Sequence, residues 1–252
     1  MQGAPAIVRS LHADERGFAT THDPRFARDR QAILRLVGRH PALAAAVVRL
    51  APSERDDVQA RLDLQRLAAQ SPPLRARIRV GRPAPAARLL GWYREAQARF
   101  GVRWQLLAAI NFVESAFGKV RNTSTAGAQG PMQFLPATWR AYGLGGNVHD
   151  PHDAILGAAN YLRANGAAHD ERDALFQYNH SRLYVDAVLH YAHRIARVPT
   201  AFAEYYAWDV YIRTAHGSRR VPARRQRRMS SARRNARSSD WRAFRRGSRS
   251  VS

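Results

Sequence analysis

The feature that most constrains the fold is an apolar helix that ends near a glutamate and runs into a glycine-rich loop. Within Trp104–Phe117, apolar side chains recur at three- and four-residue spacing, which is the pattern of one face of an α-helix. Glu114 lies four residues after Ile110 and three before Phe117, so it sits beside or on this apolar stripe. Gly118 is a suitable helix end. A chain with this pattern must bury the helix and keep a carboxyl group at its C-terminal end.

The position of Glu114 predicts a raised pKa. Apolar neighbours desolvate the carboxylate, and the negative end of the helix dipole also disfavours its charged form. A carboxylic acid that is still protonated near neutral pH is what a general acid requires. Position alone leaves an alternative open, in which Glu114 reaches solvent or pairs with one of the many arginines.

The loop after the helix favours the first interpretation. It spans Asn122–Gln133 and contains Gly127 and Gly130, which allow positive φ angles or close approach to a ligand. Gln133 is a polar amide between two apolar residues, which suggests a specific hydrogen bond. The loop therefore has the composition of a binding segment.

Four segments, in order along the chain, together resemble the lytic transglycosylases of the lysozyme-like superfamily. The pattern of that family is E-S, then A-G-A-x-G-x-M-Q, then A-x-x-Y-L, then Y-N. The matching segments here are Glu114-Ser115, 126–133 (AGAQGPMQ), 158–162 (AANYL) and Tyr178-Asn179. The resemblance covers roughly residues 86–197, about half the chain. It implies an all-α, lysozyme-like catalytic domain.

The resemblance also implies roles for individual residues. Glu114 matches the catalytic acid/base of the family, and the residue after it completes the end of the catalytic helix. Tyr178 matches the family's tyrosine near that carboxylate. The positions that would contact substrate are Ser115, Ser124, Gln133, Tyr178, Asn179 and Tyr161. For Tyr161, a place in the core is an equal alternative.

The scarcity of carboxylates around Glu114 favours a reaction that needs only one carboxyl group. No Asp or Glu occurs between Ser115 and His149, and helix capping accounts for the later acids, which are Asp150, Asp153, Asp170 and Asp173. One carboxylate suffices for glycosidic cleavage when the substrate assists itself. The resemblance implies this route for peptidoglycan, with formation of 1,6-anhydro-N-acetylmuramic acid. It implies neither a metal nor an organic cofactor.

One departure from the family concerns the segment after Tyr178-Asn179. Many relatives continue with A-G-x-G and a separate E-T-R-x-Y-V segment, whereas this chain runs directly into 180–185 (HSRLYV). The compact form resembles an actinobacterial-type branch.

We expect four regions along the chain. Residues 1–25 have little periodicity and are expected to be poorly ordered. Residues 26–85 form accessory helices and a Pro-rich linker, and residues 86–217 form the lysozyme-like domain. Alternation over 205–222 indicates a small C-terminal hairpin, and residues 218–252 form a disordered Arg/Ser-rich tail.

The charge of the chain bears on its partners. The formal net charge is +22, and residues 218–252 contribute 13 arginines against one acid. Such a tail is attracted to anionic polymers, although it contains no recognisable element for reading nucleic acid. There are no cysteines and no stretch long enough to span a membrane. The N-terminus lacks the pattern of a signal peptide, yet a peptidoglycan substrate places the expected activity outside the cytoplasm.

Three other functions stay open at this point. The first is a hydrolytic muramidase on the same fold, the second a non-catalytic wall-binding protein, and the third a nucleic-acid-binding protein. The chemistry at Glu114 separates the first two from a transglycosylase, because a muramidase adds water and a binding protein cleaves nothing.

Overall fold

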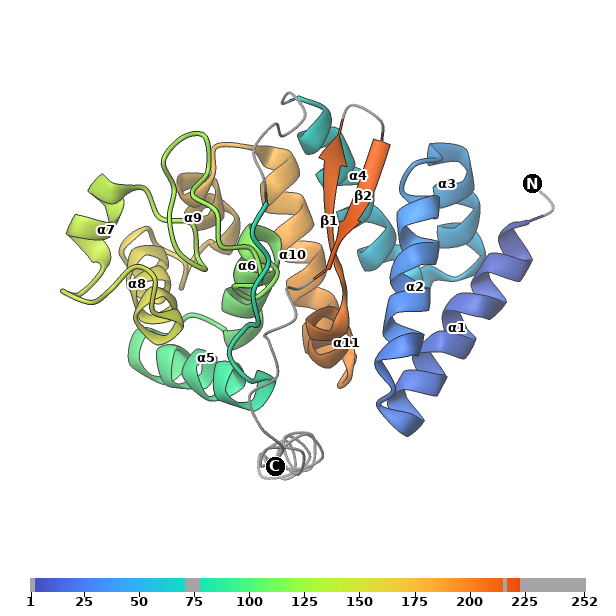
Figure 1. The fold of residues 1–252 in the computed structure, drawn as a ribbon, viewed down its shortest axis with the longest axis horizontal. Helices are drawn as coiled ribbons and strands as arrows, with labels where there is room; N and C mark the ends of the chain where they lie inside the picture. Colours follow the sequence, from blue (N-terminus) through green and yellow to red (C-terminus); the bar gives the residue numbers. More distant parts are fainter. Residues whose placement is uncertain (1–2, 71–77, 215–216, 223–252) are drawn as a thin grey trace.

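The computed structural model describes residues 3–70, 78–214 and 217–222. Within these residues the protein forms eleven α-helices, one short 3₁₀ helix and a single two-stranded hairpin (Figure 1). The prediction of an all-α fold with a small C-terminal hairpin is therefore confirmed.

The helices fall into an N-terminal group and a larger group that contains Glu114. The first group is α1 (Ala4–Thr21), α2 (Pro24–Val37), α3 (Pro41–Leu50), η1 (Pro52–Glu54) and α4 (Arg55–Ala69). The second group is α5 (Ala86–Phe100), α6 (Trp104–Ser115), α7 (Pro136–Tyr142), α8 (Pro151–Ala164), α9 (Glu171–Tyr178), α10 (Arg182–Arg197) and α11 (Ala201–Ala207). The strands β1 (Val210–Thr214) and β2 (Gly217–Val221) pair antiparallel, with Val210 opposite Val221.

The N-terminal segment corrects the sequence prediction. Residues 1–25 were expected to be poorly ordered, but α1 occupies most of them. Its buried side chains are Ala4, Leu11 and Phe18, spaced seven residues apart. Ile7 and Val8 are partly buried beside them, so the first half of α1 has a short apolar stripe, and only Phe18 continues it after Leu11. Gly17 lets the ring of Phe26 on α2 approach closely, because a Cβ there would lie 2.6 Å from that ring.

Helix α6 lies inside the molecule (Figure 1). All six residues from Leu106 to Asn111 are at most 1% exposed, so the helix is buried on every side rather than along one stripe. Helices α5, α8, α10 and α11 pack against it. One cluster of buried apolar side chains includes residues from every described α-helix except α7, whose Trp139 packs against it. The N-terminal helices therefore share the core that surrounds Glu114.

A buried ion network joins the two helical groups. Arg30 on α2 is 0% exposed, and its Nη2 lies 2.6 Å from both Glu54 Oε2 and Asp57 Oδ2. Arg194 on α10 contacts the same Asp57 oxygen at 2.6 Å and Glu204 Oε2 on α11 at 2.9 Å. Because the two arginines share the Asp57 carboxylate, the network fixes α10 relative to α2 and α4.

Two further segments differ from the predicted boundaries. Residues 218–221 form part of β2, so the predicted disordered tail cannot begin at Ser218; the rest of that prediction, from residue 223 on, lies outside the described residues. In the predicted linker, Val80 pairs with Val120 as an isolated antiparallel bridge. Backbone pairing, which proline content does not reveal, orders both segments. Within the described residues, no helix is long and apolar enough to cross a membrane.

Removal of Arg30 should destabilise the protein strongly. Arg30→Ala leaves Glu54 and Asp57 buried without this partner, so we expect the free energy of unfolding to fall by about 3–5 kcal/mol. The control is Arg25→Ala on the same helix, because the Arg25 side chain is 82% exposed and its surface pair with Asp23 contributes little to stability. Urea unfolding followed by circular dichroism measures both, and equal losses in the two variants would contradict the account.

Candidate active site

The C-terminal end of α6 carries Glu114 in its last turn. The helix ends at Ser115, and the next three residues, Ala116, Phe117 and Gly118, have φ angles of 51°, 64° and 78°. The N–H of Ala116 donates to Phe112 O at 2.8 Å, and the N–H of Phe117 donates to Asn111 O at 3.0 Å. Left-handed backbone is costly for residues other than glycine, and such strain gathers at functional sites.

Glu114 is partly buried and hydrogen-bonded. Its Oε1 accepts a hydrogen bond of 2.7 Å from the hydroxyl of Tyr184 on α10. Burial raises the pKa of Glu114 to about 7, while the hydrogen bond from Tyr184 acts in the opposite direction. The structure thus supports the raised pKa that the sequence pattern predicts. Near neutral pH this carboxyl group can both give up and accept a proton.

The tyrosine that contacts Glu114 was not assigned by the sequence analysis. That role fell to Tyr178, whose hydroxyl instead donates to Met132 O at 2.7 Å. Tyr178 is still close, since burial and then the charge of Glu114 raise the pKa of its phenol. The available signal was the Tyr184-Val185 pair in the segment 180–185, which resembles the end of E-T-R-x-Y-V.

Ser115 holds the loop rather than facing an open site. Its side chain is buried (1% exposed), its Oγ donates to Pro131 O at 2.5 Å, and it accepts from the N–H of Gly118 at 2.8 Å. Asn111, also buried, donates to the same Pro131 carbonyl at 2.8 Å and accepts from Tyr93 Oη at 2.6 Å. We therefore correct Ser115 from a substrate-contacting to a positioning residue. Asn111 and Tyr93 are positioning residues that the sequence analysis missed, because a buried asparagine inside an apolar helix has no distinctive spacing.

The glycine-rich loop folds back on itself. Gln129 and Phe134 form an antiparallel bridge, and Ser124, at the exposed end of the loop, accepts a hydrogen bond of 3.0 Å from the N–H of Ala128. Gln133 has a φ of 50° and donates from Nε2 to Gly130 O at 2.8 Å. The specific hydrogen bond expected for Gln133 is therefore present, and it joins two residues of the loop itself.

Three aromatic side chains, Phe134, Tyr161 and Tyr178, form an aromatic wall that lies near Glu114 through Tyr178. The rings of Tyr161 and Tyr178 meet edge-to-face with centroids 5.5 Å apart, and Phe134 lies 5.8 Å from Tyr178. Tyr161 is partly buried and donates to Gln177 O at 2.7 Å. Asn179 ends α9 and is partly buried. Of the residues predicted to contact substrate, Tyr178 is the one whose phenol is close enough to Glu114 to feel its charge, and Tyr161 packs against Tyr178.

Four of the other acids near this region already have partners. Asp150 and Asp170 accept hydrogen bonds from the first N–H groups of α8 and α9. Asp153 Oδ2 accepts from the N–H of Asn147 at 2.8 Å. Glu171 is ion-paired with Arg103. Among the described residues, no cluster of three or more histidines or acids is arranged to hold a metal ion.

The part of the chain that contains Glu114 is similar in sequence to known proteins. Residues 92–194 match the family model of the transglycosylase SLT domain. This match supports the lytic transglycosylase superfamily. A 70-residue stretch is 40% identical to a protein named transglycosylase from Enterobacteria phage PRD1; it covers 28% of this chain and 26% of that protein. The chain therefore matches about a quarter of the length of that relative. No solved structure matches significantly.

The SLT segment begins within α5 and ends within α10. It includes Glu114, Tyr184 and the glycine-rich loop. It excludes the N-terminal helices and α11, which contribute to the shared core and to the ion network, and it also excludes the hairpin.

Two glycines of the loop give a matched test of its packing. Gly130 has a φ of 74°, and a Cβ there would lie 1.9 Å from Val148 O, whereas Gly127 has a φ of 85° and open space around it. Gly127→Ala should cost about 1–2 kcal/mol of unfolding free energy from backbone strain alone. Gly130→Ala should cost more, because the loop must also move away from Val148. Urea unfolding measures both, and equal costs would show that contact with Val148 does not fix the loop.

Proposed function

We propose that the protein is a peptidoglycan lytic transglycosylase. It would cleave the β-1,4 bond between N-acetylmuramic acid and N-acetylglucosamine and form a 1,6-anhydro ring, with Glu114 as its one catalytic carboxyl group. The observation that carries the proposal is the raised pKa of Glu114, about 7, at a position where its described hydrogen-bond partner is a tyrosine and not a second acid. The SLT match over the same segment supports it.

In the first step Glu114 acts as a general acid. Its carboxyl proton passes to the glycosidic oxygen, and the bond from that oxygen to C1 of N-acetylmuramic acid breaks. The acetamide oxygen of the same sugar stabilises the positive charge that develops at C1. Glu114 is left as a carboxylate, and the hydrogen bond from Tyr184 stabilises this charged form.

In the second step Glu114 acts as a general base. The carboxylate takes the proton of the C6 hydroxyl group, whose oxygen bonds to C1 and closes the anhydro ring. Glu114 returns to the protonated form with which it began. No water is consumed, and no metal or organic cofactor enters either step. A pKa near the working pH suits a group that serves as acid and then as base.

We assign substrate contacts to residues around this carboxyl group. Gln133 keeps its Oε1 without a hydrogen bond among the described residues, so this oxygen can accept from a sugar hydroxyl. Ser124 lies exposed on the loop, and Tyr178 and Asn179 lie at the end of α9. Tyr161 would stack or pack against a sugar ring through the aromatic wall. Ser115 would act only by holding the loop.

The proposed substrate sets the expected location and partners. Peptidoglycan strands lie outside the cytoplasm, so the protein would act there. The Arg-rich residues from 223 on lie outside the described structure, and their contact with anionic polymers stays a prediction. The assignment to an actinobacterial-type branch also stays a prediction.

Product analysis tests the proposal. Purified peptidoglycan sacculi are incubated with the wild type, with Glu114→Gln and with Glu95→Gln, a control on an exposed glutamate of α5. The wild type and the control should release anhydro-muropeptides, about 18 Da lighter by mass spectrometry than hydrolysed ones because no water is added. Glu114→Gln should release them at least about 100-fold more slowly, since it lacks the acid.

Other outcomes would contradict the proposal. Reducing-end muropeptides from the wild type would identify a hydrolytic muramidase. No release by the wild type, under conditions where a known lytic enzyme works, would indicate a wall-binding protein. Full activity of the Glu114→Gln variant would show that Glu114 is not the catalytic acid.

A further inference from the structure

Lys119 lies just after α6 and is the only lysine in the chain. Its side chain is partly buried. The Nζ donates hydrogen bonds of 2.6 Å to two main-chain carbonyl oxygens, Tyr206 O near the end of α11 and Trp208 O directly after that helix. We call residues 206–209 the connector, because they lead from α11 to β1. Lys119 thus joins the segment after α6 to the connector.

The main chain at Lys119 is tied to the end of α6. The N–H of Lys119 donates to Ala116 O at 3.3 Å, and the N–H of the next residue, Val120, donates to Ser115 O at 2.9 Å. Ser115 follows Glu114 directly in the sequence. A displacement of Lys119 would therefore move the turn that ends the helix of Glu114.

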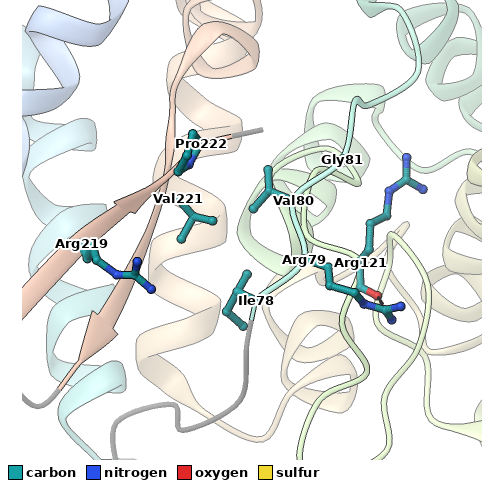
Figure 2. A pocket seen from close by; sticks show the side chains of 8 residues that line it. All are labelled: Ile78, Arg79, Val80, Gly81, Arg121, Arg219, Val221 and Pro222. Atoms are coloured by element: carbon teal, nitrogen blue, oxygen red, sulfur yellow. Dashed lines mark hydrogen bonds between the residues drawn. The ribbon is translucent and has the colours of Figure 1, made fainter. Parts of the chain in front are cut away.

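A cavity of about 540 Å³ separates residues 78–81, which lie beside Lys119, from β2 (Figure 2). The N–H of Gly81 donates to Lys119 O at 2.8 Å, so these residues and the segment after α6 are held together. Figure 2 shows Val80 on one side of the cavity and Val221 on the other. Side chains across a cavity lose the contacts that packing would give them. The hydrogen bonds of Lys119 therefore supply a connection that side-chain packing does not supply at the cavity.

The ammonium group of Lys119 suits this connection. Burial lowers the pKa of Lys119 to about 8; the charge of Arg28 lowers it as well, and the charge of Asp209 acts in the opposite direction. The group is therefore still charged at neutral pH, and hydrogen bonds from a charged donor are stronger than neutral ones. The Nζ also lies 5.5 Å from the centre of the Tyr206 ring. A compact ammonium with three donors can bind two carbonyl oxygens at once.

The two residues whose carbonyl groups bind Lys119 also pack against the end of α6. The Trp208 ring meets the ring of Phe112 edge-to-face, with centroids 5.6 Å apart. The Tyr206 ring lies 6.0 Å from the ring of Phe117. Phe112 and Phe117 stand on either side of Glu114 in the sequence. The position of the connector therefore affects the packing of the helix turn that carries Glu114.

We propose that Lys119 is a positioning residue for Glu114. It holds the connector against the turn after α6, which keeps the last turn of α6 packed and limits the access of water to the carboxyl group. The effect on catalysis rests on the proposed function, in which Glu114 is the acid. The inference also gives α11 and the start of the hairpin, which lie outside the SLT match, a role at the site.

The titration of Glu114 provides the first test and needs no substrate. It is followed in the full chain by carbon-13 NMR of the glutamate carboxyl groups. Lys119→Met keeps an unbranched side chain but removes its donors, so the last turn of α6 should loosen and admit water. Because burial is what raises the pKa of Glu114, its titration should move down by at least about one pH unit. Lys119→Arg keeps the charge and the donors and should titrate as the wild type does.

Gln31 on α2 provides a matched control. Its Nε2 donates to Asp209 O at 2.8 Å, and its Oε1 accepts from the N–H of Asp209 at 3.0 Å. Gln31→Met therefore also introduces a methionine and also removes two hydrogen bonds to the connector, but from α2 and not from the segment after α6. Urea unfolding should show a loss of stability in both methionine variants. Only Lys119→Met should change the titration of Glu114.

Cleavage kinetics on soluble peptidoglycan strands at pH 7 provide the second test. In Lys119→Met, kcat should fall at least about fivefold, because a pKa lower by about one unit leaves less of Glu114 protonated. KM should stay close to that of the wild type, because the residues assigned to substrate contact are not altered. Lys119→Arg should restore kcat, and Gln31→Met should cleave as the wild type does.

Two results would overturn the inference. The first is a destabilised Lys119→Met protein in which Glu114 titrates as in the wild type, since Lys119 would then serve stability alone. The second is an equal shift of the titration in Gln31→Met, since the shift would then report a general loosening of the connector. If Lys119→Met does not fold, Lys119→Gln replaces it. This variant keeps an amide donor, should shift the titration in the same direction by less, and with no shift would also overturn the inference.

The titration and the cleavage assay separate the inference from the proposed function. A lower titration in Lys119→Met, together with no cleavage of any glycan by the wild type, would support the positioning role and reject the proposed function. Cleavage by the wild type that depends on Glu114 but has the same kcat in Lys119→Met would support the proposed function and overturn the inference.

Discussion

The structure depends on holding one partly buried carboxyl group at the C-terminal end of a buried helix. Burial of Glu114 disfavours its charge, and the helix dipole adds to this effect. The chain can hold such a group only because three left-handed residues turn it back immediately after α6. Asn111 and Ser115 hold this turn in place, because both donate hydrogen bonds to the carbonyl oxygen of Pro131. The glycine-rich loop is thus held to the same helix that supplies the acid.

Helix α10 links this site to the rest of the molecule. It presents Tyr184 to Glu114 near one end and Arg194 to the buried ion network near the other. It also packs along α4, so the N-terminal helices support the helix from which Glu114 receives its hydrogen bond. The SLT match ends within α10. The accessory helices therefore have a structural role beside the matched segment, namely to hold α10 in place.

The sequence predicted the parts of the structure that follow from local pattern. Periodicity located α6, capping aspartates located the starts of α8 and α9, and glycine content located the loop. Local sequence patterns gave wrong predictions where contacts between residues distant in the sequence determine the structure. Helix α1 was missed because its packed apolar residues are sparse after Leu11. Ser218 was placed in a disordered tail although it pairs across the hairpin with Arg213. At the site, the sequence indicated Glu114 and its raised pKa but assigned the nearby tyrosine role to Tyr178. Which tyrosine reaches the carboxyl group depends on how α10 crosses α6, and no local pattern records that crossing.

The most direct test of the account is the pKa of Glu114 itself, measured by carbon-13 NMR of glutamate side-chain carboxyl groups, with Glu114→Gln to assign the signal. The account predicts a titration near pH 7, because burial favours the protonated form. In Tyr184→Phe the titration should move to higher pH, since the lost hydrogen bond stabilises the carboxylate. With a raised pKa, the folded protein holds a proton that the unfolded chain has released, so stability should fall as pH rises from about 4.5 to about 7. A titration near 4.5 in the wild type would contradict the account, because Glu114 would then be charged at neutral pH and unable to act as the acid.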